Sequence, residues 1–232
     1  MIALFLDFAR AVVAGDADEV SRRLVDCPSL ATVPSGQGAA RHGAPGYFFT
    51  DIAHYLYAGD TALHMAAAAW RRRIAEILIA RGADCRAKNR RGAEPLHYAA
   101  DANHWDPPAQ AAMIEYLVSV GADPNALDNA GVAPLHRAVR TRSLAAVRAL
   151  LDGGANARRP NKAGSTPLHL AVQTTGRGGS GSPQAREQQA GIVRLLLERG
   201  ARTGDRDGRG KAVHQAATSI WSRTVLDEAT AG

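Results

Sequence analysis

Hydrophobic residues recur at helical spacing along most of the chain. The aliphatic side chains of Ile74, Ile77 and Leu78 fall at positions i, i+3 and i+4, which share one face of an α-helix. The same spacing returns in two later segments, as Ile114, Leu117 and Val118 and as Val193, Leu196 and Leu197. The pattern therefore predicts a series of helices, each with one buried face.

The N-terminal stretch from Met1 to Gly15 is apolar but is interrupted by Asp7 and Arg10. No basic leading region and no small-residue cleavage site accompany it, so we expect an amphipathic helix and not a signal peptide. No uninterrupted apolar run approaches the roughly 18 residues that span a bilayer. We expect a cytoplasmic protein with no transmembrane segment.

A Leu-His pair followed by small apolar residues recurs at intervals near 33 residues. The histidines of the four clear copies, and of a weaker copy at Val213-His214, are His64, His97, His136, His169 and His214. A Gly-Ala pair follows each of the four clear copies, beginning at Gly82, Gly121, Gly154 and Gly200. The chain is therefore built from repeated units.

Each unit contains signals for two helices. Thr166 suits a helix N-cap and Pro167 the first helical position, where no amide needs a partner. Glycine in the Gly-Ala pair suits the end of a second helix. The run from Thr166 to Ala171 matches the motif T-P-L-H-x-A, and on this motif and period the chain resembles the ankyrin repeat family.

The resemblance implies an all-α fold, a solenoid of stacked helix-turn-helix units with β-turn fingers. We expect one domain over residues 1–228, with about six repeats and a tail at 229–232. The expected segments are units at 3–35, 58–90, 91–129, 130–162, 163–207 and 208–228, with an insert at 36–57. Further insertions fall in the inter-helix turns of the third and fifth repeats.

The insert at 36–57 belongs to the first finger and is rich in aromatic residues. We call this insert the aromatic finger, and its aromatic residues are Tyr47, Phe48, Phe49, Tyr55 and Tyr57. An extended finger could fold over the concave face as a lid or contact patch. It could equally bury its rings against the first repeat as a cap, and the sequence leaves both alternatives open.

The other two insertions each precede a second helix. Asp106-Pro107 and Ser182-Pro183 suit the N-cap and first position of lengthened helices, which would flank the fourth repeat. Residues Gly176 to Gly181 match G-x-G-x-x-G, but no strand precedes them as a dinucleotide site requires. An anion or small ligand near Gly176–Ser182, held by Arg177, is the weaker hypothesis that survives.

The turn between the two helices of each repeat forms one edge of the stack. Six residues after the repeat histidine, where the family usually has glycine, the later units carry Trp70, Asn103, Arg142, Thr175 and Ile220. Tryptophan and arginine often carry binding energy, so this edge is a candidate contact surface. The alternative is that bulky residues only pad the turns.

Composition narrows the chemistry. The 232 residues include 28 basic and 22 acidic ones, giving a net charge of +6, which permits an acidic partner. Two cysteines form neither a disulfide framework nor a four-ligand zinc site, and successive repeat histidines stand too far apart to share a metal. We expect no cofactor and no metal. Arginine content alone is weak support for nucleic-acid binding, which we consider unlikely.

The resemblance implies a monomeric protein-binding module that uses its concave groove, here together with the insertion-bearing edge, for an acidic or polar partner. The candidate partner-binding residues are Arg90, Arg91, Tyr98, Asp101, His104, Trp105, Arg140, Arg142, Gln173 and Arg177. The alternative is a small-molecule or enzymatic pocket of about 300–1,000 Å³, enclosed by the aromatic finger and the two inserts. No paired nucleophile and base stands at motif spacing, so the sequence favours a binding protein.

Overall fold

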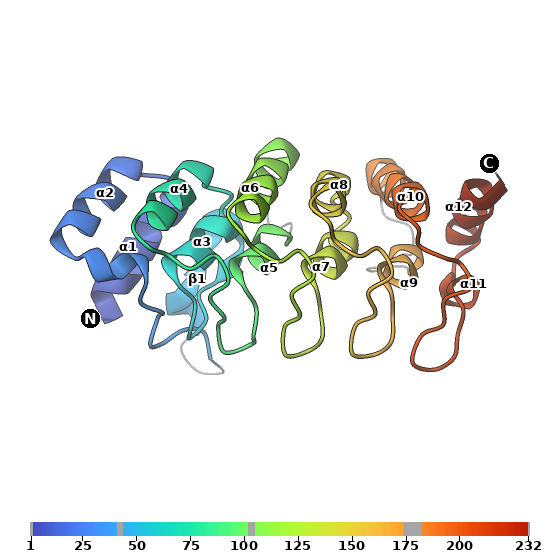
Figure 1. Ribbon diagram of the computed structural model, residues 1–232, viewed down its shortest axis with the longest axis horizontal. Coiled ribbons are helices and arrows are strands. Elements are labelled where there is room, and N and C mark those ends of the chain that lie inside the picture. Colours follow the sequence, from blue (N-terminus) through green and yellow to red (C-terminus); the bar gives the residue numbers. More distant parts are fainter. Residues whose placement is uncertain (1, 41–43, 102–104, 174–181, 232) are drawn as a thin grey trace.

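The chain folds into an elongated stack of helix pairs (Figure 1). The computed structural model describes residues 2–40, 44–101, 105–173 and 182–231. The first helices of the pairs are α1 (Ile2–Ala14), α3 (Ala62–Ala68), α5 (Pro95–Ala99), α7 (Pro134–Arg140), α9 (Pro167–Val172) and α11 (Val213–Ala216). The second helices are α2 (Ala17–Asp26), α4 (Arg72–Ala80), α6 (Pro107–Ser119), α8 (Leu144–Asp152), α10 (Pro183–Glu198) and α12 (Ile220–Ala231). The expected all-α solenoid is confirmed.

Side-chain caps begin the helices where the sequence predicted them. Asp106 Oδ1 accepts a hydrogen bond from the Ala109 amide at 3.1 Å, and Ser182 Oγ accepts one from the Ala185 amide at 3.2 Å. These bonds satisfy amides that have no partner inside their helices. The second helices of the third and fifth pairs are consequently long, with 13 residues in α6 and 16 in α10. Both pack against α8, which has 9 residues.

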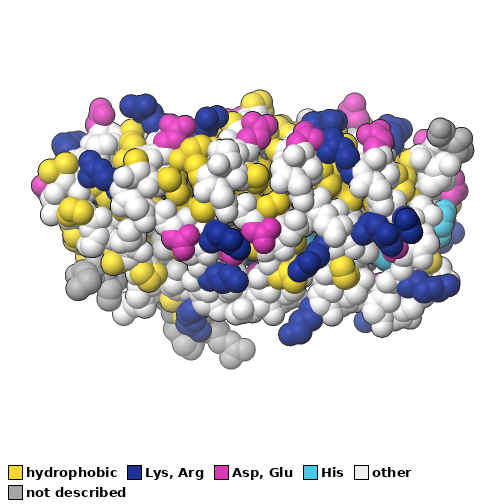
Figure 2. All heavy atoms as spheres, viewed as in Figure 1, with side chains coloured by type: hydrophobic (Ala, Val, Ile, Leu, Met, Phe, Trp, Pro, Cys, Tyr) yellow, Lys and Arg dark blue, Asp and Glu magenta, His cyan; other side chains and the backbone are white. Residues whose placement is uncertain are grey.

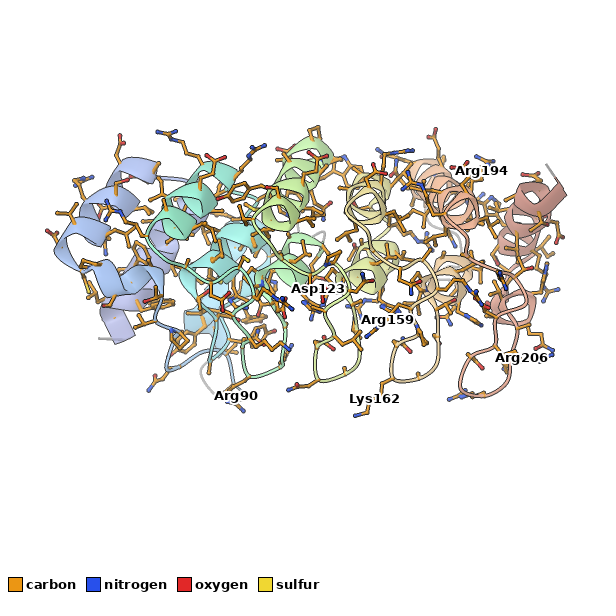
Figure 3. All side chains as sticks on the ribbon, in the orientation of Figure 1. Arg90, Asp123, Arg159, Lys162, Arg194 and Arg206 are labelled. Carbon is orange, nitrogen blue, oxygen red and sulfur yellow. The ribbon has the colours of Figure 1, made fainter. Side chains whose placement is uncertain are left out.

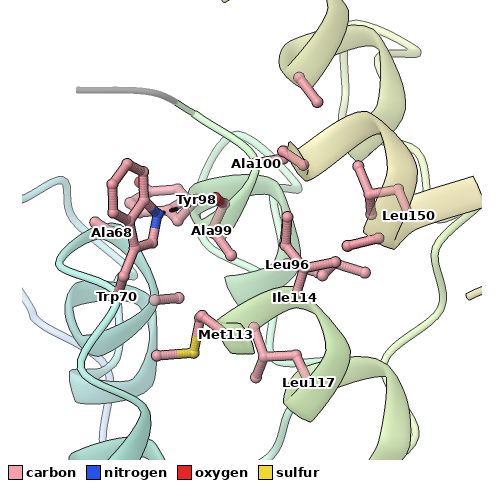
Figure 4. Close-up of a cluster of buried hydrophobic side chains, with 14 of the residues drawn as sticks. Ala68, Trp70, Leu96, Tyr98, Ala99, Ala100, Met113, Ile114, Leu117 and Leu150 are labelled. Carbon is pink, nitrogen blue, oxygen red and sulfur yellow. Dashed lines mark hydrogen bonds between the residues drawn. The ribbon is translucent and has the colours of Figure 1, made fainter. Parts of the chain in front are cut away.

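The core runs continuously through the stack and consists of small and aliphatic side chains. Figure 4 shows Leu96 of α5 and Ile114 of α6 inside one pair, with Leu150 of the next pair beside them. All of these side chains are fully buried, as is the run of alanines in α3. Alanine lets helix backbones approach closely, which explains how a chain with few aromatic residues fills its interior.

The two ends of the stack are helical. In α1 the buried residues Phe5, Phe8, Ala9 and Val12 form one face, as expected for an amphipathic helix. At the other end α12 continues to Ala231, so residues 229–231, which we had assigned to a tail, are helical. Within the described ranges, no helix is both long enough and apolar enough to cross a bilayer.

Three of the repeat histidines connect their pair to the next, whereas Nε2 of His136 is buried without a hydrogen-bond partner among the described residues. Nε2 of His64, His97 and His169 lies 3.0, 3.0 and 3.1 Å from a backbone carbonyl oxygen of the following finger. The Glu94 amide donates to Nδ1 of His97 at 3.1 Å, so Nε2 carries the ring proton and donates to the Val132 oxygen. These histidines are structural, as the sequence indicated.

We predict that His97 makes stability depend on pH. Burial lowers the pKa of His97 to about 4, whereas an unfolded histidine titrates near 6.5. Between these values the unfolded chain binds one more proton, so stability falls as pH drops from about 6.5 to 4, by about 3 kcal/mol for this residue. His97→Gln should therefore flatten the dependence of urea unfolding on pH.

Leu96→Ala is the control, because loss of a buried aliphatic side chain lowers the free energy of unfolding by a similar amount at every pH. If His97→Gln and the wild type lose stability equally between pH 7 and 4.5, the buried neutral histidine is not the cause.

Candidate functional site

β-turn fingers project from the described part of the stack beside the first helices (Figure 1). Their turns are closed by side chains: Asn89 Oδ1 accepts from the Arg91 and Ala93 amides at 2.8 and 3.1 Å, and Asp128 Oδ1 does the same in the next finger. The tips therefore have fixed shapes. Figure 3 shows Arg90 and Lys162 pointing outward from two tips, and Figure 2 shows Lys and Arg side chains along this margin.

Neighbouring fingers are bonded to each other. The Asn129 amide donates to the Arg91 carbonyl oxygen at 2.8 Å, and Asn129 Nδ2 donates to the Arg90 oxygen at 3.1 Å. The side chains of Arg90 and Arg91 are exposed and enter no ion pair with a described residue. Two arginines are thus held on a rigid backbone with their charges unpaired.

The aromatic finger contains a small hairpin between β1 (Phe48–Phe49) and β2 (His54–Tyr55), with the helical turn Thr50–Ile52 between them. Phe49, Ile52 and Leu56 are buried, and the turn packs on α1. The finger therefore caps the core of the first pairs. Phe49 is not available as a contact residue, in contrast to the patch considered from the sequence.

The far side of the aromatic finger faces α5 and the next finger. The His54 ring stacks edge-on against Tyr98 at 4.8 Å between centroids, and burial lowers the pKa of His54. The guanidinium of Arg91 lies 4.0 Å from the centre of the Tyr57 ring, a cation–π contact. One side of the aromatic finger is thus a cap, and the other side borders the hollow lined by Arg91, so its use as a lid or contact patch stays a prediction.

Tyr98, predicted as a partner contact, is almost entirely buried and offers a partner little surface. It is 2% exposed, and its hydroxyl donates to Asp60 Oδ1 at 2.8 Å. Asn89 Nδ2 donates to the same oxygen at 2.8 Å, and the Tyr57 amide donates to Oδ2 at 2.7 Å. Burial and the neighbouring Asp60 raise the pKa of Tyr98. This network joins α5 to two fingers and is a structural support beneath the surface.

Arg137 on α7 holds two carboxylates. Its Nη1 lies 2.8 Å from Asp101 Oδ2 and its Nη2 lies 3.0 Å from Asp128 Oδ2, and all three side chains are largely buried. Burial opposes the charge of Arg137, but Asp101 and Asp128 outweigh burial and raise its pKa. Asp101 is therefore bound inside the protein, and the two acids with Arg137 leave one net negative charge beside the exposed arginines.

Two adjoining hollows lie between the fingers and the first helices, and together we call them the groove. Their volumes are about 510 and 350 Å³, and both are lined by Arg91, Arg137 and Arg140. Arg90 borders the first hollow, whereas His54, Tyr57 and Tyr98 border the second. Arg140 is exposed and, like Arg90 and Arg91, enters no ion pair with a described residue. The groove thus presents three unpaired guanidinium groups.

The small-molecule alternative requires a pocket enclosed by the aromatic finger and both inserts. The described residues that line the second hollow come from the aromatic finger, the next finger, α5 and α7 with the residues that follow each helix, and none comes from either lengthened helix. In the described part of the chain, no group of three His, Cys, Asp or Glu side chains could hold a metal. The geometry is that of a groove bordered by the aromatic finger.

The candidate residues at the edge differ in their exposure. Trp105 is 56% exposed beside the start of α6, and Gln173 is exposed after α9. His104, Arg177 and the segment Gly176 to Gly181 lie outside the described residues. Trp70, which we considered as an edge contact, is buried instead: its Nε1 donates to the Ala99 oxygen at 3.0 Å (Figure 4).

Arg142 at the same edge is half-buried and has a strained backbone. Its φ is +59°, a left-handed conformation that costs a residue with a side chain about 1–2 kcal/mol. The first pair has Gly15 at the equivalent position, with φ of +87°. Glycine adopts this conformation without strain, so the arginine replaces a residue that the turn itself favours.

Sequence reasoning missed Arg137 although a signal was available. Arg137 follows the repeat histidine His136 as Tyr98 follows His97, so the two residues occupy equivalent positions one repeat apart. The structure places both beside the groove. Because Tyr98 was already a candidate, a comparison of equivalent positions in neighbouring repeats would have identified Arg137.

The fold defines a class: a helical repeat solenoid in which β-turn fingers project beside the first helices. The family model for ankyrin repeats, in three copies, matches residues 39–128 and 107–207. The chain therefore belongs to the ankyrin repeat family, and ankyrin repeats are generally protein–protein interaction modules. Comparison with curated proteins finds no match.

We predict that Arg137→Met destabilises the protein by about 3 kcal/mol, because it leaves two largely buried carboxylates without their cation. Chemical unfolding measures the loss. Adding Asp101→Asn to Arg137→Met should recover part of it.

The matched control is Arg140→Met, which removes an exposed arginine from the same helix and should change stability by less than about 0.5 kcal/mol. Equal effects of the two methionine variants would contradict the role given to the Arg137 ion pairs.

Proposed function

We propose that this domain binds an acidic segment of a partner protein in the groove. The observation that carries the proposal is the convergence of Arg90, Arg91 and Arg140, none of them in an ion pair with a described residue, on two adjoining hollows. The linings of these hollows together contain four arginines and two aspartates, so they are net basic. Guanidinium groups bind carboxylates through paired, charge-assisted hydrogen bonds, so an extended acidic chain matches this surface.

Preorganisation supports the same assignment. Arg91 rests on the Tyr57 ring, and its finger is bonded to the next one. Arg137 fixes Asp101 and Asp128, so these acids are not free to turn toward Arg140. Less side-chain freedom is lost on binding when the receiving groups are already held in place.

The edge that carries Trp105 and Arg142 adds a second contact to the same partner. Thr141 lines both the second hollow of the groove and a cavity at this edge, so the two hollows adjoin at this residue. A segment lying in the groove can therefore extend across Thr141 onto the edge. An exposed tryptophan beside an arginine is typical of residues that contribute strongly to binding.

We predict that reversing three groove charges weakens binding of a fluorescein-labelled peptide of ten glutamates. The triple variant Arg90→Glu, Arg91→Glu, Arg140→Glu should bind about tenfold or more weakly, because it replaces attraction by repulsion at the contact. Fluorescence anisotropy at low salt measures the dissociation constant.

The matched control makes the same charge change on exposed arginines of second helices, as Arg73→Glu, Arg148→Glu, Arg194→Glu. The control lowers the net charge by the same amount but leaves the groove intact. It removes only long-range attraction and no direct contact, so it should weaken binding only slightly. Equal weakening by both triples would show that net charge, and not the groove, recruits the peptide.

A further inference from the structure

Arg142 occupies a position that glycine suits better. It lies in the turn between α7 and α8, with φ of +59°, and the first pair has Gly15 there. A side chain is disfavoured in this conformation because its Cβ crowds the backbone. Arg142 therefore imposes a strain that its own turn does not require.

The equivalent residue of the second pair shows how such strain can be compensated. Trp70 has φ of +53°, but its ring is buried in the core, and its Nε1 donates to the Ala99 oxygen at 3.0 Å. Packing and a hydrogen bond thus offset the strained conformation inside the fold.

Arg142 has no comparable compensation. Its Nη2 is buried but makes no hydrogen bond, and the guanidinium forms no ion pair with a described residue. Burial lowers the pKa of Arg142, since the charge has lost water without gaining a partner. A buried donor without an acceptor is costly, so both the backbone and the charge of Arg142 are unfavourable in the free protein.

Arg142 lines a cavity of about 350 Å³ at the insertion-bearing edge. Trp105, 56% exposed, forms an apolar wall, and Gln184 and Gln188 from α10 add amide groups. No Asp or Glu is among the described lining residues. Thr141 connects this cavity, which we call the edge cavity, to the groove.

We propose that the edge cavity binds a single carboxylate, the side chain of an acidic residue in the partner segment, with the apolar part of that residue or its neighbour against Trp105. This proposal rests on the proposed function, because the carboxylate comes from the acidic segment that the groove binds. One guanidinium matches the single charge and two oxygens of a carboxylate, whereas a phosphate dianion would keep a second charge unpaired in a cavity without another described cation.

The test uses phenylacetate as the probe, because it joins a carboxylate to an apolar ring. Nuclear magnetic resonance of the full chain follows the indole N–H of Trp105 and the Nε–H of Arg142. Both signals should shift saturably with phenylacetate. Phenylacetamide, which is neutral and nearly the same shape, should bind at least about tenfold more weakly. Inorganic phosphate, titrated in parallel, should bind more weakly than phenylacetate.

Arg142→Gly separates binding from folding. Glycine accepts the left-handed turn, so this variant should melt at the wild-type temperature or above it and should lose the saturable shift of Trp105. Trp70→Gly, the same change at the equivalent position of the second pair, should melt at a lower temperature because it empties part of the core.

The outcomes distinguish this site from the groove. The variant with charge reversal at Arg90, Arg91 and Arg140 should still bind phenylacetate, even where it no longer binds the glutamate peptide. The proposal is overturned if Arg142→Gly keeps the Trp105 shift or melts several degrees lower, or if phenylacetamide or phosphate binds as tightly as phenylacetate. Those results would stand whether or not the groove binds the peptide.

Discussion

The hydrogen bonds of the repeat histidines set the geometry on which the rest of the structure depends. Each of His64, His97 and His169 accepts a bond from the start of its own helix, while its other nitrogen lies about 3 Å from a carbonyl oxygen of the next finger. The three rings are buried and these bonds are directional, so they fix three fingers against the preceding first helix. The hydrophobic core supplies most of the stabilisation, but these bonds determine where the fingers point.

Fixed fingers explain why the groove is charged in one region. Arg90 and Arg91 are displayed by a finger bonded to its neighbour, and Arg140 ends the first helix of the next pair. Their convergence results from stacking, since they stand about fifty residues apart in the chain. The acids nearby are committed to Arg137, which leaves the exposed guanidinium groups unpaired. Repeat geometry thus converts scattered basic residues into one surface.

Much of this architecture could be predicted from the sequence because its signals are local. The Leu-His period, the caps at Asp106 and Ser182 and the Gly-Ala pairs each act within a few residues, and the structure contains the helices they indicate. Three features depended on distant neighbours. Tyr98 is buried and bonds to Asp60, which stands 38 residues earlier in the chain. Trp70 is buried and bonds to Ala99 of α5. Arg137 forms ion pairs with Asp101 and Asp128, which belong to two other segments. Exposure and pairing are tertiary properties, so residue type alone did not reveal them.

We propose that the groove, through Arg90, Arg91 and Arg140, receives an acidic protein segment. Mapping the amide resonances that shift on titration with the ten-glutamate peptide tests this binding site most directly, because the map reports where the peptide lies. We expect shifts concentrated in the fingers around residues 89–92 and 128–131 and at the end of α7. Shifts confined to the second helices α4, α8 and α10, or spread evenly over all exposed arginines, would contradict it.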